Sequence, residues 1–194
     1  MFFIGIKDDI VDLSAEKKLY GQLVSAIIIV LFANIRITSM YGLFGVYQIP
    51  YWLSICISLF TILVIVNAFN LIDGIDGLAG GIGAIASFTY GLWFYNYNQI
   101  ALCILAFALF SALLAFLVYN FSPANIFIVD TGSLTIGLIM AVLTVNFLEL
   151  SFDSTPFTFP FKSSPAMAIA ILILPLFDTM RVFIVRLMNK KSPL

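Results

Sequence analysis

Long apolar stretches separated by short polar breaks make up most of the chain. A helix that crosses a bilayer needs about 20 mostly apolar residues. The breaks are rich in Gly, Pro, Asn, Asp and Ser, which favour turns. The pattern therefore predicts six transmembrane helices. They are expected at approximately Leu23–Ile37, Tyr51–Phe69, Ala79–Tyr95, Ile100–Tyr119, Leu134–Leu150 and Pro165–Val185.

The composition supports this interpretation. Hydrophobic residues make up 62% of the 194 residues and charged residues only 10%, whereas a soluble domain carries about 25% charged residues. One soluble core cannot hide such an apolar excess, because a domain of this length still exposes much of its surface. We therefore expect an all-α, polytopic membrane helix bundle that forms one integral membrane domain over residues 1–194. The expected surroundings are the lipid bilayer, and no nucleic-acid partner is expected.

Charged residues are distributed unequally between the two sides that these helices would define. One side carries Lys7, Lys17, Lys18, Arg186, Lys190 and Lys191, and the other carries only Arg36 and Lys162. Basic loops favour the cytoplasmic side of a membrane. Most acidic residues share the basic side, namely Asp8, Asp9, Asp12, Glu16, Asp73, Asp76 and Asp130. The sequence thus predicts a single acidic site that faces the cytoplasm.

A polar stripe lies at the end of the second predicted helix. It consists of Asn67, Asn70, Asp73 and Asp76. Helix residues three apart lie on nearly one face, and a charge at mid-bilayer costs roughly 2.5–3.5 kcal/mol. We therefore expect these acids at the interface, in a hydrated cleft or on a cation. An ordinary polar loop is the alternative.

Two further acidic segments are candidates for chemistry. Neighbouring carboxylates on a helix point about 100° apart, so Asp8 and Asp9 are expected to have separate roles, of which proton acceptor is one and solvated surface charge the alternative. Asp130 precedes Thr131, Gly132 and Ser133 at the start of a predicted helix, where free N–H groups favour an anion and Ser133 is a candidate cap. There Asp130 is suited to hold a cation that bridges to a phosphate, and simple helix capping is the rival interpretation.

The last predicted helix and the possible metal ligands complete this picture. Pro175 is expected to kink the helix, and Asp178 is expected to pair with Arg181. The chain has no histidine, and neither of its two cysteines belongs to a CxxC pair. Oxygen ligands alone favour Mg²⁺ or Mn²⁺. An ion-coupled transporter with intramembrane acids would fit these observations as well.

Four motifs, taken in order, resemble a known enzyme family. They are Gly5-Ile6-Lys7-Asp8-Asp9 with Lys18 and Gln22, Asn67 to Leu78 (NxxNxxDGxDGL), Phe127 to Ser133, and Pro175 to Thr179 with Lys191-Ser192-Pro193. Their order is similar to that of the polyprenyl-phosphate N-acetylhexosamine-1-phosphate transferases, or glycosyl transferase family 4. The family's histidine motif and its earlier helices have no counterpart here, so we expect the central portion of a larger fold. Val129 stands where the family usually has Gly.

The resemblance implies a Mg²⁺-dependent transfer, with Mn²⁺ as the other candidate metal. A phospho-N-acetylhexosamine, expected to be N-acetylglucosamine 1-phosphate, would pass from a UDP-N-acetyl sugar to undecaprenyl or another polyprenyl phosphate, with release of UMP. The setting would be cell-envelope polysaccharide synthesis at the bacterial cytoplasmic (inner) membrane. An inactive fragment of such an enzyme is the alternative within the family.

The resemblance also implies roles for individual residues. Asp130 and Asn67 would hold the metal, and Asp8 or Asp9 would orient or deprotonate the lipid phosphate. The nucleotide or sugar would be contacted by Asn70, Asp73, Asp76, Gly132 and Ser133.

Overall fold

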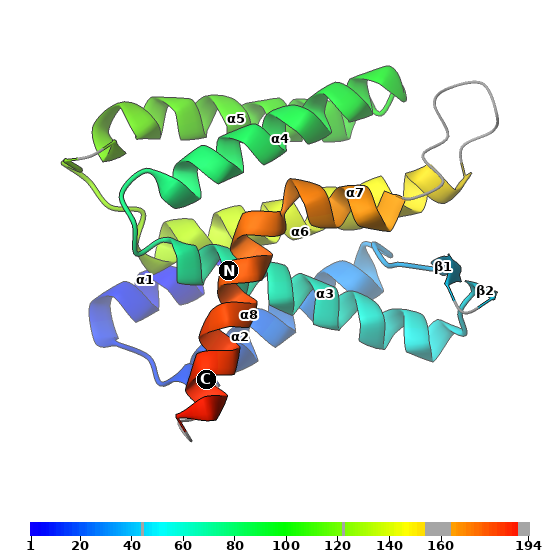
Figure 1. Cartoon of the computed structure of the whole chain (residues 1–194), viewed down its shortest axis with the longest axis horizontal. Helices are drawn as coiled ribbons and strands as arrows, with labels where there is room; N and C mark the ends of the chain where they lie inside the picture. The colour runs from blue at the N-terminus through cyan, green and yellow to red at the C-terminus, as the bar shows by residue number, and fades with distance from the viewer. Residues whose placement is uncertain (44, 122, 154–163, 190–194) are drawn as a thin grey trace.

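A computed structural model describes residues 1–43, 45–121, 123–153 and 164–189. Lys162, Lys190, Lys191, Ser192 and Pro193 lie outside these ranges. The elements are α1 (Phe2–Val11), α2 (Ala15–Ile27), the π-helical turn η1 (Ile28–Phe32), β1 (Ser39–Leu43), β2 (Val46–Gln48), α3 (Tyr51–Ile72), α4 (Leu78–Asn96), α5 (Ile100–Asn120), α6 (Val129–Asp153), α7 (Ser164–Ile171) and α8 (Ile173–Met188) (Figure 1). The predicted helix bundle is confirmed, with one small antiparallel hairpin of β1 and β2 added to it.

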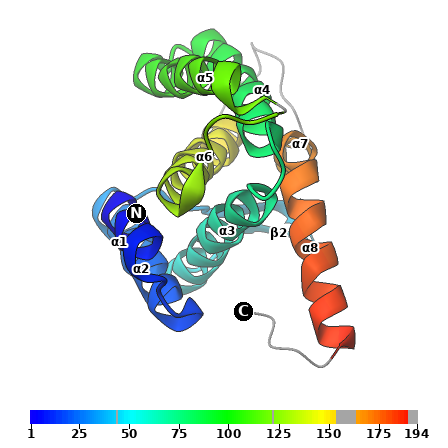
Figure 2. The same cartoon turned by 90° about the vertical axis from the view of Figure 1, so that its left-hand side faces the viewer.

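The helices α3 and α6 pack against each other at the centre of the bundle. The α4–α5 pair covers one side of them, α1 and α2 cover another, and α8 lies across α3 (Figure 2). The approach of α6 to α3 is close because Gly137 has no side chain. A Cβ at Gly137 would lie 2.8 Å from the Cα of Val66, closer than packed carbon atoms come.

The number of candidate membrane spans is lower than predicted. Among the described residues, three helices are long and apolar enough to cross a membrane: Tyr51–Ile72, Ile100–Asn120 and Val129–Ser151. The bent pair α7–α8 would be a fourth if it counts as one span. The helix α4 forms where predicted, but its Gly, Ser, Thr and Tyr residues make it less apolar, and it is not among these spans.

The first predicted span is the largest error. Helix α2 already begins at Ala15, so its first turn carries Glu16, and the helical segment ends with η1 at Phe32 instead of continuing to Ile37. Residues 34–38 then have no regular secondary structure, and some of their backbone groups find side-chain partners elsewhere. The N–H of Ile37 donates to Ser58 Oγ at 2.8 Å, and the N–H of Thr38 donates to Glu149 at 3.0 Å.

The predicted kink near Pro175 is confirmed. The helices α7 and α8 meet at Leu172 with a bend of 76°. Proline has no N–H, and its ring clashes with the carbonyl group four residues earlier, which here belongs to Ile171. The helix therefore breaks just after Ile171. On α8, the expected pair of Asp178 and Arg181 is present at 3.5 Å.

The grouping of loops also agrees with the prediction. Helix α1, the α3–α4 loop and the α5–α6 loop lie at one end of the bundle, while the hairpin and the α4–α5 turn lie at the other (Figure 1). The first end brings together residues that lie far apart in the sequence, and it contains the acidic segments singled out above.

Candidate active site

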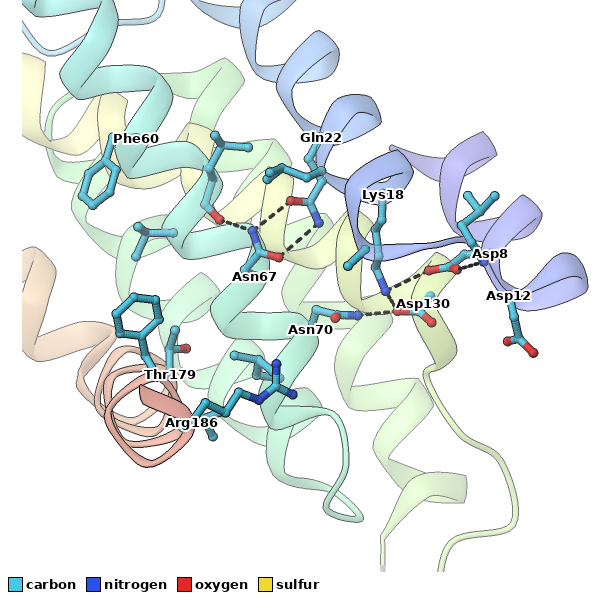
Figure 3. Close-up of a pocket in the computed structure, with 18 residues that line it drawn as sticks. Asp8, Asp12, Lys18, Gln22, Phe60, Asn67, Asn70, Asp130, Thr179 and Arg186 are labelled. Atoms are coloured by element: carbon cyan, nitrogen blue, oxygen red, sulfur yellow. Dashed lines mark hydrogen bonds and ion pairs between the residues drawn. The ribbon is translucent and has the colours of Figure 1, made fainter. Parts of the chain in front are cut away.

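A cavity of about 620 Å³ opens between α2, α3 and α8, beside the first turn of α6 (Figure 3). Its lining changes character along α3, from the apolar side chains of Phe60, Leu63 and Val64 to the amides of Asn67 and Asn70. Val182 and Phe183 of α8 complete the apolar part, and the polar part is completed by α1, α2, the start of α6 and Arg186 of α8. Such a cavity suits an amphiphile that has a charged head and an apolar chain.

The polar end is organised around the ammonium group of Lys18. Lys18 Nζ lies 2.8 Å from a carboxylate oxygen of Asp8 and also contacts Asp130 Oδ1 (Figure 3). Burial alone would lower the pKa of Lys18, but its hydrogen bonds to Asp130 and Asp8 outweigh burial and raise it. Lys18 therefore carries its charge at neutral pH and partly neutralises two carboxylates from different helices.

Asp8 is the one buried charged residue in the part of the chain that the structure describes, at 6% exposure. Burial alone would raise its pKa. Hydrogen bonds from Lys18 and from the N–H of Leu13, the latter at 2.8 Å, outweigh burial and hold the pKa of Asp8 below its ordinary value. The side chain is thus an anion at neutral pH in the wall of the cavity.

The carboxylate of Asp9 lies at a different place from that of Asp8, as expected for neighbouring side chains on a helix. Its carboxylate accepts hydrogen bonds from the backbone N–H groups of Asp130, at 2.9 Å, and Thr131, at 3.2 Å. It also accepts one from the Thr131 hydroxyl group. Asp9 does not line the cavity. Its catalytic role therefore stays a prediction, while its contacts are with the start of α6.

The two asparagines of α3 occupy different places. Asn70 donates to Asp130 Oδ1 and, at 2.9 Å, to Ser133 Oγ. Asn67, one turn earlier, pairs with the amide of Gln22 through bonds of 2.8 and 3.3 Å. The structure thus brings Asn70, rather than Asn67, into direct contact with Asp130. The metal-binding role of Asn67 stays a prediction.

The first turn of α6 differs from the sequence expectation in one respect. The helix begins at Val129, so Ser133 lies inside it and is not its cap. Ser133 is 1% exposed, and its hydroxyl oxygen accepts the bond from Asn70. At Gly132, a Cβ would lie 2.5 Å from a side-chain carbon of Ile128. The predicted substrate contacts of Gly132 and Ser133 remain untested.

The α3–α4 loop carries the remaining two predicted acids outside the cavity. Asp73 is half-buried, and burial together with the charges of Asp130 and Asp9 raises its pKa to about 7. Asp76 is exposed and accepts the N–H of Ala124 at 3.3 Å. Asp73 therefore changes charge near neutral pH, close to the other carboxylates.

Asn120 joins this loop to the segment that precedes α6. It is 4% exposed, accepts the N–H of Gly77 at 2.9 Å and donates to the carbonyl group of Ile126 at 2.7 Å. The sequence interpretation assigned it no role. A lone asparagine at the end of an apolar run, opposite another polar loop, is the signal that could have indicated it.

Arg186 and the amide of Gln22 also line the cavity, and the sequence interpretation assigned no role to them. Arg186 extends from α8 into the cavity, toward the polar wall (Figure 3). On α8, the residues that line the cavity are Thr179, Val182, Phe183 and Arg186. Their spacing of three and four residues is that of one helix face, so periodicity could have indicated the stripe.

The donor set is compatible with a magnesium ion. Among the described residues, no three His, Cys, Asp or Glu side chains form a metal-binding group. Asp8 and Asp130, however, are close enough to share the Lys18 ammonium group, so one cation can contact both. Mg²⁺ is usually bound by one or two carboxylates together with substrate phosphates.

Comparison with known proteins places these residues in context. The family model described as "Glycosyl transferase family 4" matches residues 1–148. A probable undecaprenyl-phosphate N-acetylglucosaminyl 1-phosphate transferase of Bacillus subtilis (strain 168) is 34% identical over 197 residues, which cover 97% of this chain and 50% of the relative.

Two further relatives show the same pattern. An undecaprenyl-phosphate alpha-N-acetylglucosaminyl 1-phosphate transferase of Salmonella typhi is 29% identical over 200 residues, which cover all of this chain and 52% of the relative. A phospho-N-acetylmuramoyl-pentapeptide-transferase of Enterococcus hirae is 33% identical over 154 residues, 73% of this chain and 47% of the relative. The chain thus spans about half the length of the curated relatives it matches.

Proposed function

Because the chain belongs to glycosyl transferase family 4, we propose that it forms the transfer site of a membrane enzyme for phosphosugars. The enzyme moves N-acetylglucosamine 1-phosphate from its UDP-sugar to undecaprenyl phosphate and releases UMP. The names of the relatives support this sugar and this acceptor. The observation that carries the proposal is the cavity itself, which joins a charged end at Lys18 to an apolar end between α3 and α8.

The acceptor lipid matches this cavity in chemistry. Its phosphate would lie near Lys18 and Arg186, the cations among the described residues of the lining, and its prenyl chain would lie along Phe60, Val182 and Phe183. Burial of apolar surface is worth roughly 25 cal/mol per Å², so each isoprene unit that enters the apolar end adds affinity. A free sugar phosphate would use only the polar end.

In the transfer step, an oxygen of the lipid phosphate attacks the β-phosphorus of the UDP-sugar. The bond from that phosphorus to the bridging oxygen breaks, and UMP leaves with the electron pair. Such reactions depend mainly on positioning and on neutralisation of charge. A phosphate monoester has a second pKa near 6 and is mostly a dianion at neutral pH. Asp8, whose pKa is lowered, is therefore suited to orient Lys18 rather than to take up a proton.

We propose that Mg²⁺ binds at the same end of the cavity, with Mn²⁺ as the other candidate. We propose Asp130 as its carboxylate ligand and Asn67 as its amide ligand, and Asp8 is close enough to Asp130 to share the cation. A divalent ion would neutralise charge on the phosphates during transfer. The donor nucleotide and sugar would be contacted by Asn70, Asp73, Asp76, Gly132 and Ser133.

The proposed site faces the cytoplasm at the bacterial inner membrane. The lysines and acids of α1, α2 and the α3–α4 loop lie at one end of the bundle, and basic segments favour the cytoplasmic side. UDP-sugars are made in that compartment, so this orientation gives the donor access. The alternative of an ion-coupled transporter receives no support from the relatives.

Exchange of labelled UMP into UDP-N-acetylglucosamine tests the proposal. The chain is assayed alone and in a chimera in which residues 1–194 replace the matched half of the Bacillus subtilis relative. We expect exchange by the chimera that requires undecaprenyl phosphate and Mg²⁺ and is lost in Asp130→Ala. Asp178→Asn, outside the cavity, is the matched control. A folded chimera without exchange, or one that drives ion-coupled uptake instead, would refute the proposal.

A further inference from the structure

Helix α6 has no cap from its own chain segment. The first N–H groups of a helix lack partners within it and usually bond to a side chain just before it. Here Phe127 and Ile128 precede the helix, and neither has a side-chain acceptor. Val129, its first residue, has φ of +52°, a conformation that β-branched residues rarely adopt. The entry into α6 is thus unfavourable unless other contacts support it.

Asp9 supplies the missing cap from another helix. Its two carboxylate oxygens receive the N–H groups of Asp130 and Thr131, at 2.9 and 3.2 Å, and the Thr131 hydroxyl group also donates to it. A carboxylate at this end of a helix is further favoured by the helix dipole. These bonds connect residues 121 and 122 positions apart in the sequence.

A second contact one turn earlier brings α1 against the same turn of α6. Gly5 lies four residues before Asp9, on the same face of α1. A Cβ at Gly5 would lie 2.3 Å from the Cα of Thr131 and 3.0 Å from the carbonyl oxygen of Asp130. The absence of that Cβ allows the approach that puts the Asp9 carboxylate within reach of the helix end.

We infer that Asp9 is a positioning residue that caps α6 and thereby sets where Asp130 meets Lys18 and Asn70. The inference rests on the proposed function in one point, namely that Asp130 takes part in the transfer; the cap itself does not depend on it. It divides the two neighbouring acids: Asp8 lines the cavity and contacts Lys18, whereas Asp9 is not a lining residue and acts through the backbone of α6.

The amide of asparagine distinguishes a cap from a proton acceptor. Asn caps a helix about as well as Asp, but it cannot take up a proton at neutral pH. In the chimera described above we expect Asp9→Asn to keep UMP exchange within about fivefold of the unsubstituted protein, because its oxygen still accepts an N–H. Asp9→Ala is expected to lose at least tenfold. Equal, near-complete loss in both variants would instead identify Asp9 as a proton acceptor and overturn the inference.

Hydrogen exchange tests the cap without any activity. In the 194-residue chain we expect Asp9→Ala to raise the exchange rate of the Asp130 and Thr131 amides at least tenfold, with a much smaller change in Asp9→Asn. Glu16→Ala, which removes an exposed carboxylate from α2, is the matched control and should leave both amides unchanged.

The two readouts separate this inference from the proposed function. Unchanged protection of both amides in Asp9→Ala would overturn the cap whatever the activity. If the Asp130 and Thr131 amides lose protection in Asp9→Ala but the chimera exchanges no UMP, the cap is supported and the proposed function fails. Should Asp9→Ala not fold, Thr131→Val removes only the hydroxyl contact, and an unchanged exchange rate of the Thr131 amide would then count against the inference.

Discussion

Lys18 on α2 contacts Asp130 at the start of α6, 112 residues further along the chain. The same ammonium group holds Asp8 of α1 at 2.8 Å. Three helices thus meet at one cation in the polar end of the cavity. An unpaired buried carboxylate is costly, so the position of Asp8 depends on this lysine.

Replacement of Lys18 by Met should therefore destabilise the protein. The ion pair of Lys18 and Asp8 is partly exposed, so we expect a loss of about 2 kcal/mol in the free energy of unfolding. This corresponds to a decrease of roughly 6 °C in Tm, measured by thermal unfolding in detergent. Lys17→Met is the control, because Lys17 is exposed. Equal effects of the two substitutions would show that Lys18 contributes no more than a surface charge.

The contact between α1 and α6 can be tested by adding one methyl group. Gly5→Ala would place a Cβ against the backbone of Thr131, and such overpacking costs about 1–3 kcal/mol. A matched helical position is Gly81, where a Cβ would meet nothing within 4 Å. There Ala should stabilise the helix by up to about 1 kcal/mol. Thermal unfolding should therefore shift in opposite directions, and shifts of the same sign would contradict the close contact.

Val129 gives a prediction of a different kind. The family usually has Gly at this position, and the structure shows a left-handed backbone at a half-exposed side chain. That conformation costs an L-residue about 1–2 kcal/mol. Glycine avoids this cost, but it loses more conformational entropy on folding, which offsets part of the gain. We expect Val129→Gly to stabilise by about 0.5 kcal/mol and Val129→Ala not to do so. Chemical unfolding of both variants measures the difference.

Asp73 should make stability depend on pH. Its pKa is about 7 in the folded protein and near 4 in the unfolded chain. At pH values between these two pKa values, the folded state therefore binds more protons than the unfolded state. The free energy of unfolding therefore falls as pH rises through this range. Because Asp73 is half-exposed, we expect the free energy of unfolding to fall by only about 1 kcal/mol. Unfolding at pH 5 and pH 8 should show the decrease, and Asp73→Asn, but not Asp76→Asn, should remove it.

The helices of the bundle could be predicted from sequence where one continuous apolar run corresponds to one helix. Continuous apolar runs indicated α3 and α5 almost to their ends. The first span failed because hydropathy cannot detect the partners of an extended backbone. Thr38 is held by Glu149, 111 residues away, and no local pattern shows that contact.

The site was predictable as a collection of residues and not as a set of pairs. Topology alone brought the acids to one end, because they lie in loops on the same side. The pairing depends on how α1 is rotated against α6, which the contact at Gly5 determines. Spacing along the chain therefore separated Asp8 from Asp9 but could not show which of them faces the cavity.

Arg186 gives the sharpest test of the acceptor site. It is half-buried and points into the cavity from α8, whereas Arg181 on the same helix is 72% exposed and pairs with Asp178. Loss of one charge-assisted contact to a phosphate costs about 1.5–3 kcal/mol, which corresponds to roughly 10- to 150-fold in affinity. In the chimera we expect Arg186→Gln to raise the KM for undecaprenyl phosphate by at least tenfold, with the KM for the UDP-sugar nearly unchanged. Arg181→Gln should change neither constant. A rise confined to the UDP-sugar would move Arg186 from the acceptor site to the donor site.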